Sequence, residues 1–178
     1  LHLGGGSPTM LRPDDMVALN QMLRSRFSFD ADAEISVEMD PNDLTAEKYD
    51  ALAEIGMTRA SIGVQDFDEK VQKAINREQT FEQTRDVVEQ VRARGVRSVN
   101  CDVLYGLPHQ TRQSVDQTIK QVLSLAPDRI ALFGYAHVPW MKTHQKMIDE
   151  AALTDLTERF AQMNRAASTL TSSGYTAI

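Results

Sequence analysis

Three consecutive glycines, at positions 4–6, form the segment of this chain whose residue types most directly suggest chemistry. They follow an apolar, strand-like segment at residues 1–3 and precede Ser7, Pro8 and Thr9. Because glycine has no Cβ, peptide groups in such a loop can contact a ligand directly. The hydroxyls of Ser7 and Thr9 add short-range hydrogen-bonding groups. A flexible turn between a strand and a helix has the same composition, so the glycines alone leave ligand binding and an ordinary turn both open.

Further polar side chains follow the later strand-like segments. Glu38, Gln65 and Asp102 carry oxygen atoms that accept hydrogen bonds from an amine or from ribose hydroxyls. Arg77 lies in the connection after the third strand, where a guanidinium could clamp a carboxylate with two parallel hydrogen bonds. Taken singly, each of these residues is better explained as a helix cap or a hydrated surface group. Together they predict a site for a polar, partly charged ligand that carries a ribose or an amino acid.

The elements that must position these side chains alternate along the chain between strands and helices. Such alternation implies parallel strands joined by right-handed crossovers, which is an α/β fold. A partial (β/α) barrel with outer helices and an open doubly wound sheet both fit this pattern. The glycines do not match the G-x-G-x-x-G pattern of dinucleotide-binding folds, so we predict the barrel, with ligand-binding residues at the C-terminal ends of its strands. Strands are predicted at residues 1–3, 34–38, 59–64, 96–104 and 129–133, and helices at 13–27, 45–55, 81–94, 112–125 and 155–172.

Apolar residues at helical spacing predict one apolar face on each of the later helices. The faces are Phe81, Val87, Val88 and Val91 in the helix at 81–94, Val115, Ile119 and Val122 in the helix at 112–125, and Leu156, Phe160, Met163 and Leu170 in the last helix.

Composition limits the classes of protein to consider. The chain has 178 residues, a formal net charge of −6 and one cysteine, Cys101. The acidic balance argues against a nucleic-acid surface, and no apolar run approaches the roughly 18 residues that span a bilayer. We therefore expect a protein that binds neither nucleic acid nor membrane. One cysteine excludes an internal disulfide and fits a reducing compartment, so we expect a cytoplasmic location.

The chain begins inside a strand and ends, at residues 176–178, in what we expect to be another strand. We therefore interpret it as an internal piece of a longer protein.

Six segments resemble the oxygen-independent coproporphyrinogen III oxidases, a family of radical S-adenosylmethionine enzymes in haem biosynthesis. The resemblance covers nearly the whole chain. The glycine motif is shared by many radical enzymes of this superfamily, whereas the segments at 64–67, 76–79 and 135–139 are more discriminating. The six segments are Leu-His-Leu-Gly-Gly-Gly-Ser-Pro-Thr at 1–9, Glu-Ile-Ser-Val-Glu-Met-Asp-Pro at 34–41, Ser-Ile-Gly-Val-Gln-Asp-Phe at 61–67, Asn-Arg-Glu-Gln at 76–79, Asp-Val-Leu-Tyr-Gly-Leu-Pro at 102–108 and Tyr-Ala-His-Val-Pro at 135–139.

The resemblance implies cofactor-binding roles for eight residues and assigns no catalytic residue. Gly5, Gly6 and Ser7 would contact the methionine part of S-adenosylmethionine, and Ala136 would pack near its adenosyl group. The amine, ribose and carboxylate groups of the cofactor would be bound by Glu38, Gln65, Arg77 and Asp102.

The sequence departs from the family at the metal centre. The family holds a [4Fe–4S] cluster with three closely spaced cysteines upstream of the glycine motif, and no such set exists here. The resemblance therefore implies that the cluster ligands lie outside this chain. Residues 1–178 would be part of one radical S-adenosylmethionine barrel domain, without its first strand, cluster loop and C-terminal region, and inactive alone. Cys101 is interpreted as a small apolar core residue.

The function implied by the resemblance is the oxidative decarboxylation of coproporphyrinogen III to protoporphyrinogen IX under anaerobic conditions. Its partners would be the porphyrinogen substrate and an electron donor protein or reductant. Two alternatives stay open. One is a haem chaperone of the same family, which usually lacks the combination of segments 64–67 and 76–79. The other is a phosphosugar-binding barrel with residues 4–6 around a phosphate.

Overall fold

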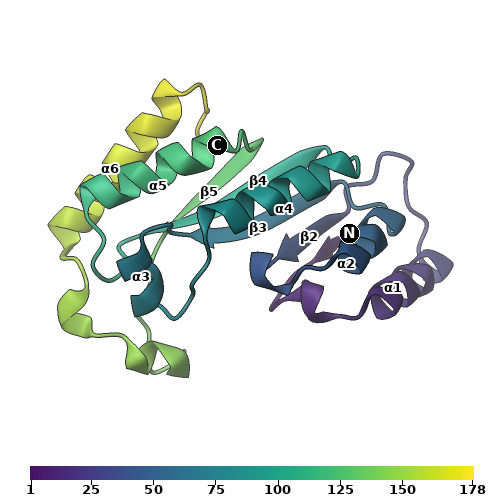
Figure 1. Ribbon diagram of the computed structural model, residues 1–178, viewed down its shortest axis with the longest axis horizontal. Helices are drawn as coiled ribbons and strands as arrows, with labels where there is room; N and C mark the ends of the chain where they lie inside the picture. The colour runs from purple at the N-terminus through teal and green to yellow at the C-terminus, as the bar shows by residue number, and fades with distance from the viewer. The chain divides into compact units, whose positions relative to one another are not determined.

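The computed structural model describes residues 1–178 and contains one five-stranded sheet (Figure 1). Neighbouring strands in the sheet are also consecutive in the chain, in the order β1-β2-β3-β4-β5. A doubly wound sheet has a permuted order, so the prediction of an α/β fold with parallel strands is confirmed and the doubly wound alternative is excluded. The strands are β1 (His2–Leu3), β2 (Ser36–Met39), β3 (Arg59–Gln65), β4 (Ser98–Tyr105) and β5 (Arg129–Gly134).

Six α-helices and four short 3-10 helices connect these strands. The helices predicted from apolar spacing are present: α1 (Pro13–Arg26), α2 (Ala46–Glu54), α4 (Phe81–Ala93), α5 (Arg112–Ser124) and α6 (Leu156–Ser172). Helix α3 (Glu69–Ala74) was not predicted, because it is too short to show an apolar stripe. Four 3-10 helices were not predicted either: η1 (Pro8–Met10), η2 (Pro41–Asp43), η3 (Thr143–Met147) and η4 (Glu150–Ala152). The strand expected at residues 176–178 is wrong, because that segment forms neither helix nor strand.

Side-chain caps fix where helices begin. Thr45, the N-cap of α2, accepts the backbone N–H of Lys48 through its hydroxyl. At α5, the Thr111 hydroxyl accepts the Ser114 N–H at 3.1 Å, and Ser114 Oγ accepts the Thr111 N–H at 2.9 Å. Such reciprocal bonds satisfy backbone donors that a helix leaves without partners in its first turn.

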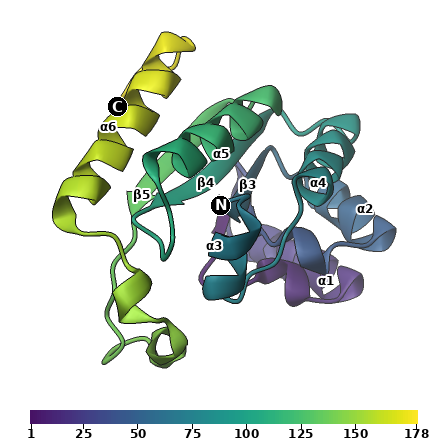
Figure 2. The ribbon, with the colours of Figure 1, turned by 60° about the vertical axis from the view of Figure 1, so that its left-hand side comes forward.

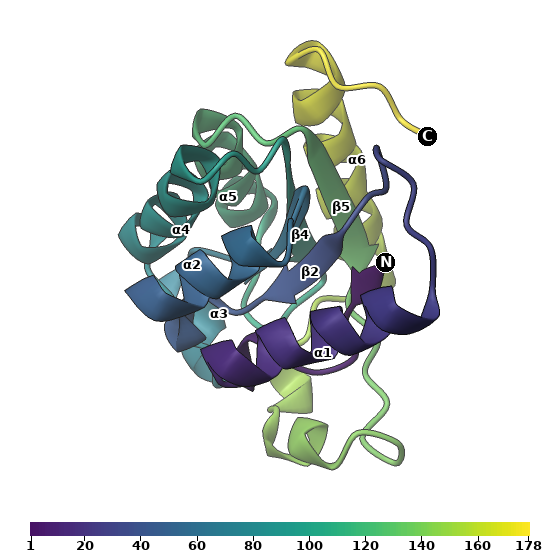
Figure 3. The same cartoon turned by 90° about the vertical axis from the view of Figure 1, so that its right-hand side faces the viewer.

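The contacts within the chain divide it into two compact units, and the first comprises residues 1–63, 82–101 and 127–129. In this unit β1 pairs with β2 in parallel, with Leu3 opposite Val37, and β2 pairs with β3 in the same sense. Helices α1 and α2 pack against each other (Figure 3). The core includes Val37, Leu52 and Ile62, none of which exposes more than 1% of its surface.

The second unit comprises residues 64–81, 102–126 and 130–178. Helices α5 and α6 lie side by side in it (Figure 2). The predicted inner face of α5 is confirmed, since Val115, Ile119 and Val122 are fully buried. The limits of the two units cross β3, β4 and β5, and a single domain over residues 1–178 stays a prediction.

The apolar face predicted for α6 does not form its packing surface. Leu156 is 83% exposed and Phe160 is 61% exposed, whereas Gln162 and Ala166 are fully buried. The helix packs through hydrogen bonds instead. Gln162 donates to the backbone carbonyl of Gln110, and the Arg165 and Thr169 side chains donate to Asp116 on α5. These bonds set the rotation of the helix about its own axis, so small and polar residues face α5.

Candidate functional site

The glycine loop lies directly beyond β1, in the first unit. Gly5 and Gly6 have φ angles of 86° and 143°, in the region where residues with a Cβ are strained. The N–H of Gly5 donates to Glu38 Oε2 at 3.1 Å, so the loop and the end of β2 are joined. Both glycines are exposed, and a Cβ at either would meet no atom within 4 Å. Space for a ligand is therefore present next to these peptide groups.

Gly4 is required for a different reason, which is the close approach of two side chains. A Cβ at Gly4 would lie 2.5 Å from His2 Nε2 and 2.8 Å from the carboxyl carbon of Glu38. His2 Nε2 is 3.4 Å from Glu38 Oε1, and His2 Nδ1 is 3.3 Å from Ser36 Oγ. The bare peptide at Gly4 therefore lets the Glu38 carboxylate lie against the loop with an imidazole beside it.

A pocket of ≈ 320 Å³ opens along this loop. It is lined by residues 2–8 together with Leu11 and Leu19. Its walls thus combine peptide groups of the glycine loop with apolar side chains of the segment before α1 and of α1 itself. A ligand with both a charged end and an apolar portion suits such a surface.

The Ser7 side chain holds the loop in place. Its hydroxyl donates to Asp43 Oδ2 at 3.0 Å and lies 3.1 Å from the Thr9 hydroxyl. Thr9 is fully buried. Gly5, Ser7 and Glu38 are therefore brought together in the first unit, as the sequence predicted for their part of the site, while the Ser7 hydroxyl serves the loop itself.

The second unit holds the four other predicted site residues, and Gln65 is the last residue of β3. Its φ is 63°, which is unusual for a residue other than glycine. The next N–H, of Asp66, donates back to the carbonyl of Val64 at 2.8 Å. The chain thus turns sharply at a residue predicted to bind the ligand.

Arg77 follows α3 in a segment that a buried amide fastens. The Gln72 side chain donates to the carbonyls of Asp66 and Gln79 at 2.8 and 2.5 Å and accepts the Gln79 N–H at 3.2 Å. The Arg77 N–H donates to the Gln72 carbonyl at 3.0 Å. This connects the Asn-Arg-Glu-Gln segment to the turn after β3, and the half-buried Arg77 side chain extends from a fixed backbone.

Asp102 and Ala136 belong to the last two strands. Asp102 is half-buried within β4 rather than at its end, which lies at Tyr105. Ala136 follows β5 and is exposed. Its carbonyl accepts from Gln145 Nε2 at 3.0 Å, and Gln145 Oε1 accepts the Val138 N–H at 2.6 Å. A buried amide therefore supports the segment around Ala136.

Sequence reasoning missed the buried residues that hold these segments: Asp66, Gln72, Gln110 and Gln145. Isolated polar residues in connections have no periodic pattern, so the only available signal was the motif around Gln65. Asp66 belongs to that motif.

The residues present do not form a metal centre. No group of three or more His, Cys, Asp or Glu side chains is arranged to hold a metal ion. Cys101 is fully buried in β4, in agreement with its interpretation as a core residue. A [4Fe–4S] cluster, which needs several thiolates, does not fit the donors of these 178 residues. The amino-acid part of S-adenosylmethionine does fit the glycine loop, where peptide N–H groups can donate hydrogen bonds and the Glu38 carboxylate can accept them.

Comparisons with known proteins agree with this pattern. The sequence model of the Radical SAM superfamily matches residues 1–122. The chain is 52% identical over 175 residues to an oxygen-independent coproporphyrinogen III oxidase of Cereibacter sphaeroides, covering 98% of this chain and 39% of that protein. It is 44% identical over 178 residues to the uncharacterized protein y4hJ of Sinorhizobium fredii, of which it covers 68%.

A solved structure gives the same result. The coproporphyrinogen III oxidase HemN of Escherichia coli, described as a radical SAM enzyme, superposes with a TM-score of 0.95 at 41% identity. The match covers 99% of this chain and 41% of that one. The chain thus spans about two fifths of the length of these oxidases.

Proposed function

Because the chain belongs to the Radical SAM superfamily, we propose that the protein binds S-adenosylmethionine and oxidatively decarboxylates coproporphyrinogen III to protoporphyrinogen IX without oxygen. The observation that carries this proposal is the 52% identity to an oxygen-independent coproporphyrinogen III oxidase over 98% of the chain. The likeness to HemN in fold, at 41% identity, supports it further. The substrate is thus a porphyrinogen, and an electron donor protein or reductant is the second partner.

The glycine loop and Glu38 contact the methionine part of the cofactor in this proposal. The peptide groups of Gly5, Gly6 and Ser7 face the ligand, and the Glu38 carboxylate, already bonded to the Gly5 N–H, accepts the α-amine. When bound and reduced by one electron from the electron donor, S-adenosylmethionine would supply the radical chemistry that removes a hydrogen atom from a propionate side chain of the substrate. The protein contributes orientation and exclusion of water around that step.

Four further residues complete the proposed contacts with the cofactor. Gln65 and Asp102 bond to the ribose hydroxyls, and Arg77 grips the methionine carboxylate with two hydrogen bonds. The exposed Ala136 packs near the adenosyl group. The buried amides of Gln72 and Gln145 keep two of these segments in place.

The cluster requires thiolates from other parts of the protein. We expect that anaerobic treatment of residues 1–178 alone with iron and sulfide gives no [4Fe–4S] absorption, because Cys101 is the only cysteine. A stoichiometric cluster on this piece would contradict the assignment.

A cytoplasmic location is part of the same proposal. No helix in the structure has the length and apolar character needed to cross a membrane.

The experiment that tests the function uses the full-length protein, reconstituted with iron and sulfide under anaerobic conditions. It is incubated with coproporphyrinogen III, S-adenosylmethionine and a reductant, and the porphyrins are separated by chromatography after oxidation. We expect protoporphyrin to form only when S-adenosylmethionine is present. Haem binding without decarboxylation would identify a haem chaperone instead, and phosphate bound at the glycine loop with no need for iron would identify a sugar-phosphate barrel.

A further inference from the structure

The backbone of Gln65 is held in a conformation that the residue would not adopt by itself. A φ of 63° places it in the left-handed region, which costs a residue with a Cβ roughly 1–2 kcal/mol. Such a conformation persists only where surrounding contacts determine it. The contacts that do so here begin at the next residue.

Asp66 is fully buried and accepts three hydrogen bonds. Its Oδ1 accepts the Asp68 N–H at 2.7 Å and the Thr118 hydroxyl at 2.9 Å. Its Oδ2 accepts from the side-chain amide of Gln110. Thr118 lies on α5 and also accepts the Phe67 N–H at 3.3 Å. The turn after β3 is therefore fixed to α5 on both sides of the carboxylate.

The amide of Gln110 extends this network to the loop after β4. Gln110 Oε1 accepts the Leu107 N–H at 2.7 Å, and Nε2 also donates to the Leu104 carbonyl at 2.9 Å. These two backbone partners fix which end of the amide is nitrogen, so the group facing Asp66 is a donor. Each polar atom of the Gln110 side chain thus has a partner.

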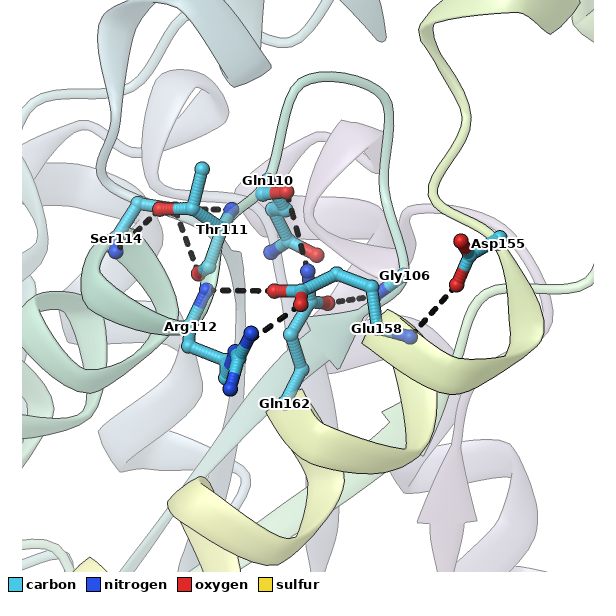
Figure 4. A network of polar contacts seen from close by, with 8 residues as sticks. All are labelled: Gly106, Gln110, Thr111, Arg112, Ser114, Asp155, Glu158 and Gln162. Carbon is cyan, nitrogen blue, oxygen red and sulfur yellow. Dashed lines mark hydrogen bonds and ion pairs between the residues drawn. The ribbon is translucent and has the colours of Figure 1, made fainter.

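A second buried amide, from α6, closes the same loop. Gln162 Oε1 accepts the Gly106 N–H at 2.9 Å, and Gln162 Nε2 donates to the Gln110 carbonyl at 3.1 Å (Figure 4). At the base of α6, Glu158 accepts the Arg112 N–H at 3.1 Å and pairs with its side chain at 3.0 Å. The partner of Asp66 is therefore itself rigidly placed.

We propose that Asp66 is a positioning residue, which holds Gln65 in its left-handed conformation and thereby directs the Gln65 amide toward the bound cofactor. This inference rests on the proposed function, because it takes Gln65 as a ribose contact. Asp66 itself is buried and does not touch the ligand. Its proposed effect on binding passes through Gln65.

The arrangement specifies a carboxylate rather than an amide. Both oxygens of Asp66 accept, and burial raises the pKa of its carboxyl against the opposing effect of its donors. An asparagine has nearly the same shape, but in either orientation its NH₂ group would face a group that also donates, and that hydrogen bond would be lost. Asp66→Asn therefore removes the specific bonds with little change in volume, and the turn is released.

The test measures the calorimetric affinity for S-adenosylmethionine in the full-length, cluster-containing protein, beside thermal melts. Asp66→Asn and Gln65→Ala should each weaken binding by roughly tenfold, the equivalent of one lost hydrogen bond of about 1.4 kcal/mol. The double variant should bind no more weakly than Gln65→Ala, because Asp66 acts only through Gln65. Asp116→Asn is the matched control: it removes another buried carboxylate that bonds to neighbouring side chains, so Tm should fall while affinity is kept.

The outcomes separate this inference from the proposed function. Unchanged affinity in Gln65→Ala would contradict the ribose contact itself. Weaker binding in Gln65→Ala with normal binding in Asp66→Asn, or additive losses in the double variant, would overturn the positioning role alone. Should Asp66→Asn not fold, Thr118→Val removes one of its donors at nearly constant volume. Thr118→Val should lose less cofactor affinity than Asp66→Asn, and it should cause no further loss when Gln65 is already alanine. If the losses from Thr118→Val and Gln65→Ala add, the positioning role of Asp66 is overturned.

Discussion

The glycine loop beyond β1 and the turn beyond β3 both carry proposed cofactor contacts, but they are built differently. The loop is exposed, and its contact with Glu38 is one hydrogen bond of 3.1 Å, donated by the Gly5 N–H to a carboxylate side chain that is 42% exposed. The turn is organised around Asp66, which is fully buried and bonded at both oxygens. One contact surface is thus free to adjust to a ligand, and the other is fixed before the ligand arrives.

This difference predicts where binding and stability separate. Substitutions in the exposed loop should change affinity with little effect on folding, because few buried contacts are lost there. Substitutions in the buried turn should change both quantities. A preorganised group also binds more tightly, since less conformational entropy is lost on binding. The following changes test the contrast, in order of decreasing expected effect.

Glu38→Ala should have the largest effect on affinity. It removes a carboxylate that would bond to the cofactor amine, and hydrogen bonds to charged groups contribute roughly 1.5–3 kcal/mol, or about tenfold to a hundredfold in affinity. We expect Tm to change by less than about 3 °C, because the side chain is partly exposed. The matched control is Glu34→Ala, which removes a glutamate that is 52% exposed and paired with Arg59 at 3.3 Å. Calorimetry should show normal cofactor affinity in that control, and an equal loss in both would contradict the role of Glu38.

Asp116→Asn should lower stability alone and show how the second unit is held together. Asp116 accepts from Arg165 Nε at 2.8 Å and from the Thr169 hydroxyl at 2.7 Å, which joins α5 to α6. Hydrogen bonds from Arg165, then Lys120, hold the pKa of Asp116 well below its usual value. Its stabilisation is therefore complete above the ordinary aspartate pKa of about 3.9 and is lost as the pH falls below it.

The measurement compares Tm of the protein and of Asp116→Asn between about pH 6 and pH 3. Because Arg165 and Lys120 are more than half exposed, we expect Asp116→Asn to lower the free energy of unfolding by only about 1–2 kcal/mol at pH 6. Each kcal/mol should lower Tm by about 2–4 °C. The difference between the two proteins should narrow as the pH falls below about 4. A difference independent of pH would mean that packing, rather than the charge, holds α6.

These contacts also show what the sequence could predict. Val115, Ile119 and Val122 occur at helical spacing, and their burial on α5 follows from periodicity alone. The same reasoning placed Leu156 and Phe160 on one face of α6, but it could not show that these two residues are exposed while Gln162 is buried through its hydrogen bonds. Periodicity predicts the burial of apolar side chains, but it does not predict packing through buried amides and ion pairs.

The candidate site divides in the same way. The proximity of the glycine loop to Glu38 follows from parallel strands whose ends meet at one edge, and the Gly5–Glu38 hydrogen bond confirms it. The network behind Gln65 could not be predicted. It joins Asp66 to residues 44 and 52 positions further along the chain, and such pairings leave no local pattern. The cofactor roles of the site residues stay predictions.

Gly4→Ala should weaken cofactor binding by roughly fivefold to tenfold, which corresponds to about 1.0–1.4 kcal/mol. The new Cβ would lie 2.8 Å from the Glu38 carboxyl and must displace it, but a flexible side chain can move at little cost in stability. Gly95→Ala is the control, since its φ of 86° makes alanine strained while nothing lies near the new Cβ. We expect the two variants to be opposite: Gly4→Ala loses affinity, and Gly95→Ala loses only stability. Loss of Tm in Gly4→Ala as large as in Gly95→Ala would show that the loop is more rigid than its exposure indicates.

His2→Ala should have the smallest effect, and it is the most sensitive test of the contrast. The imidazole touches Glu38 at 3.4 Å and Ser36 at 3.3 Å, so it could hold the carboxylate in place as Asp66 holds the turn. However, the side chains of His2 and Glu38 are 58% and 42% exposed, and exposed contacts of this kind contribute about 0–1 kcal/mol. We therefore expect His2→Ala to lower cofactor affinity by about twofold. His2→Gln, which retains a donor toward Glu38, should bind the cofactor about as tightly as the unaltered protein. A tenfold loss in His2→Ala, restored by His2→Gln, would mean that Glu38 is as strictly positioned as Gln65. The glycine loop would then be preorganised like the buried turn, by a hydrogen bond in solvent rather than by burial.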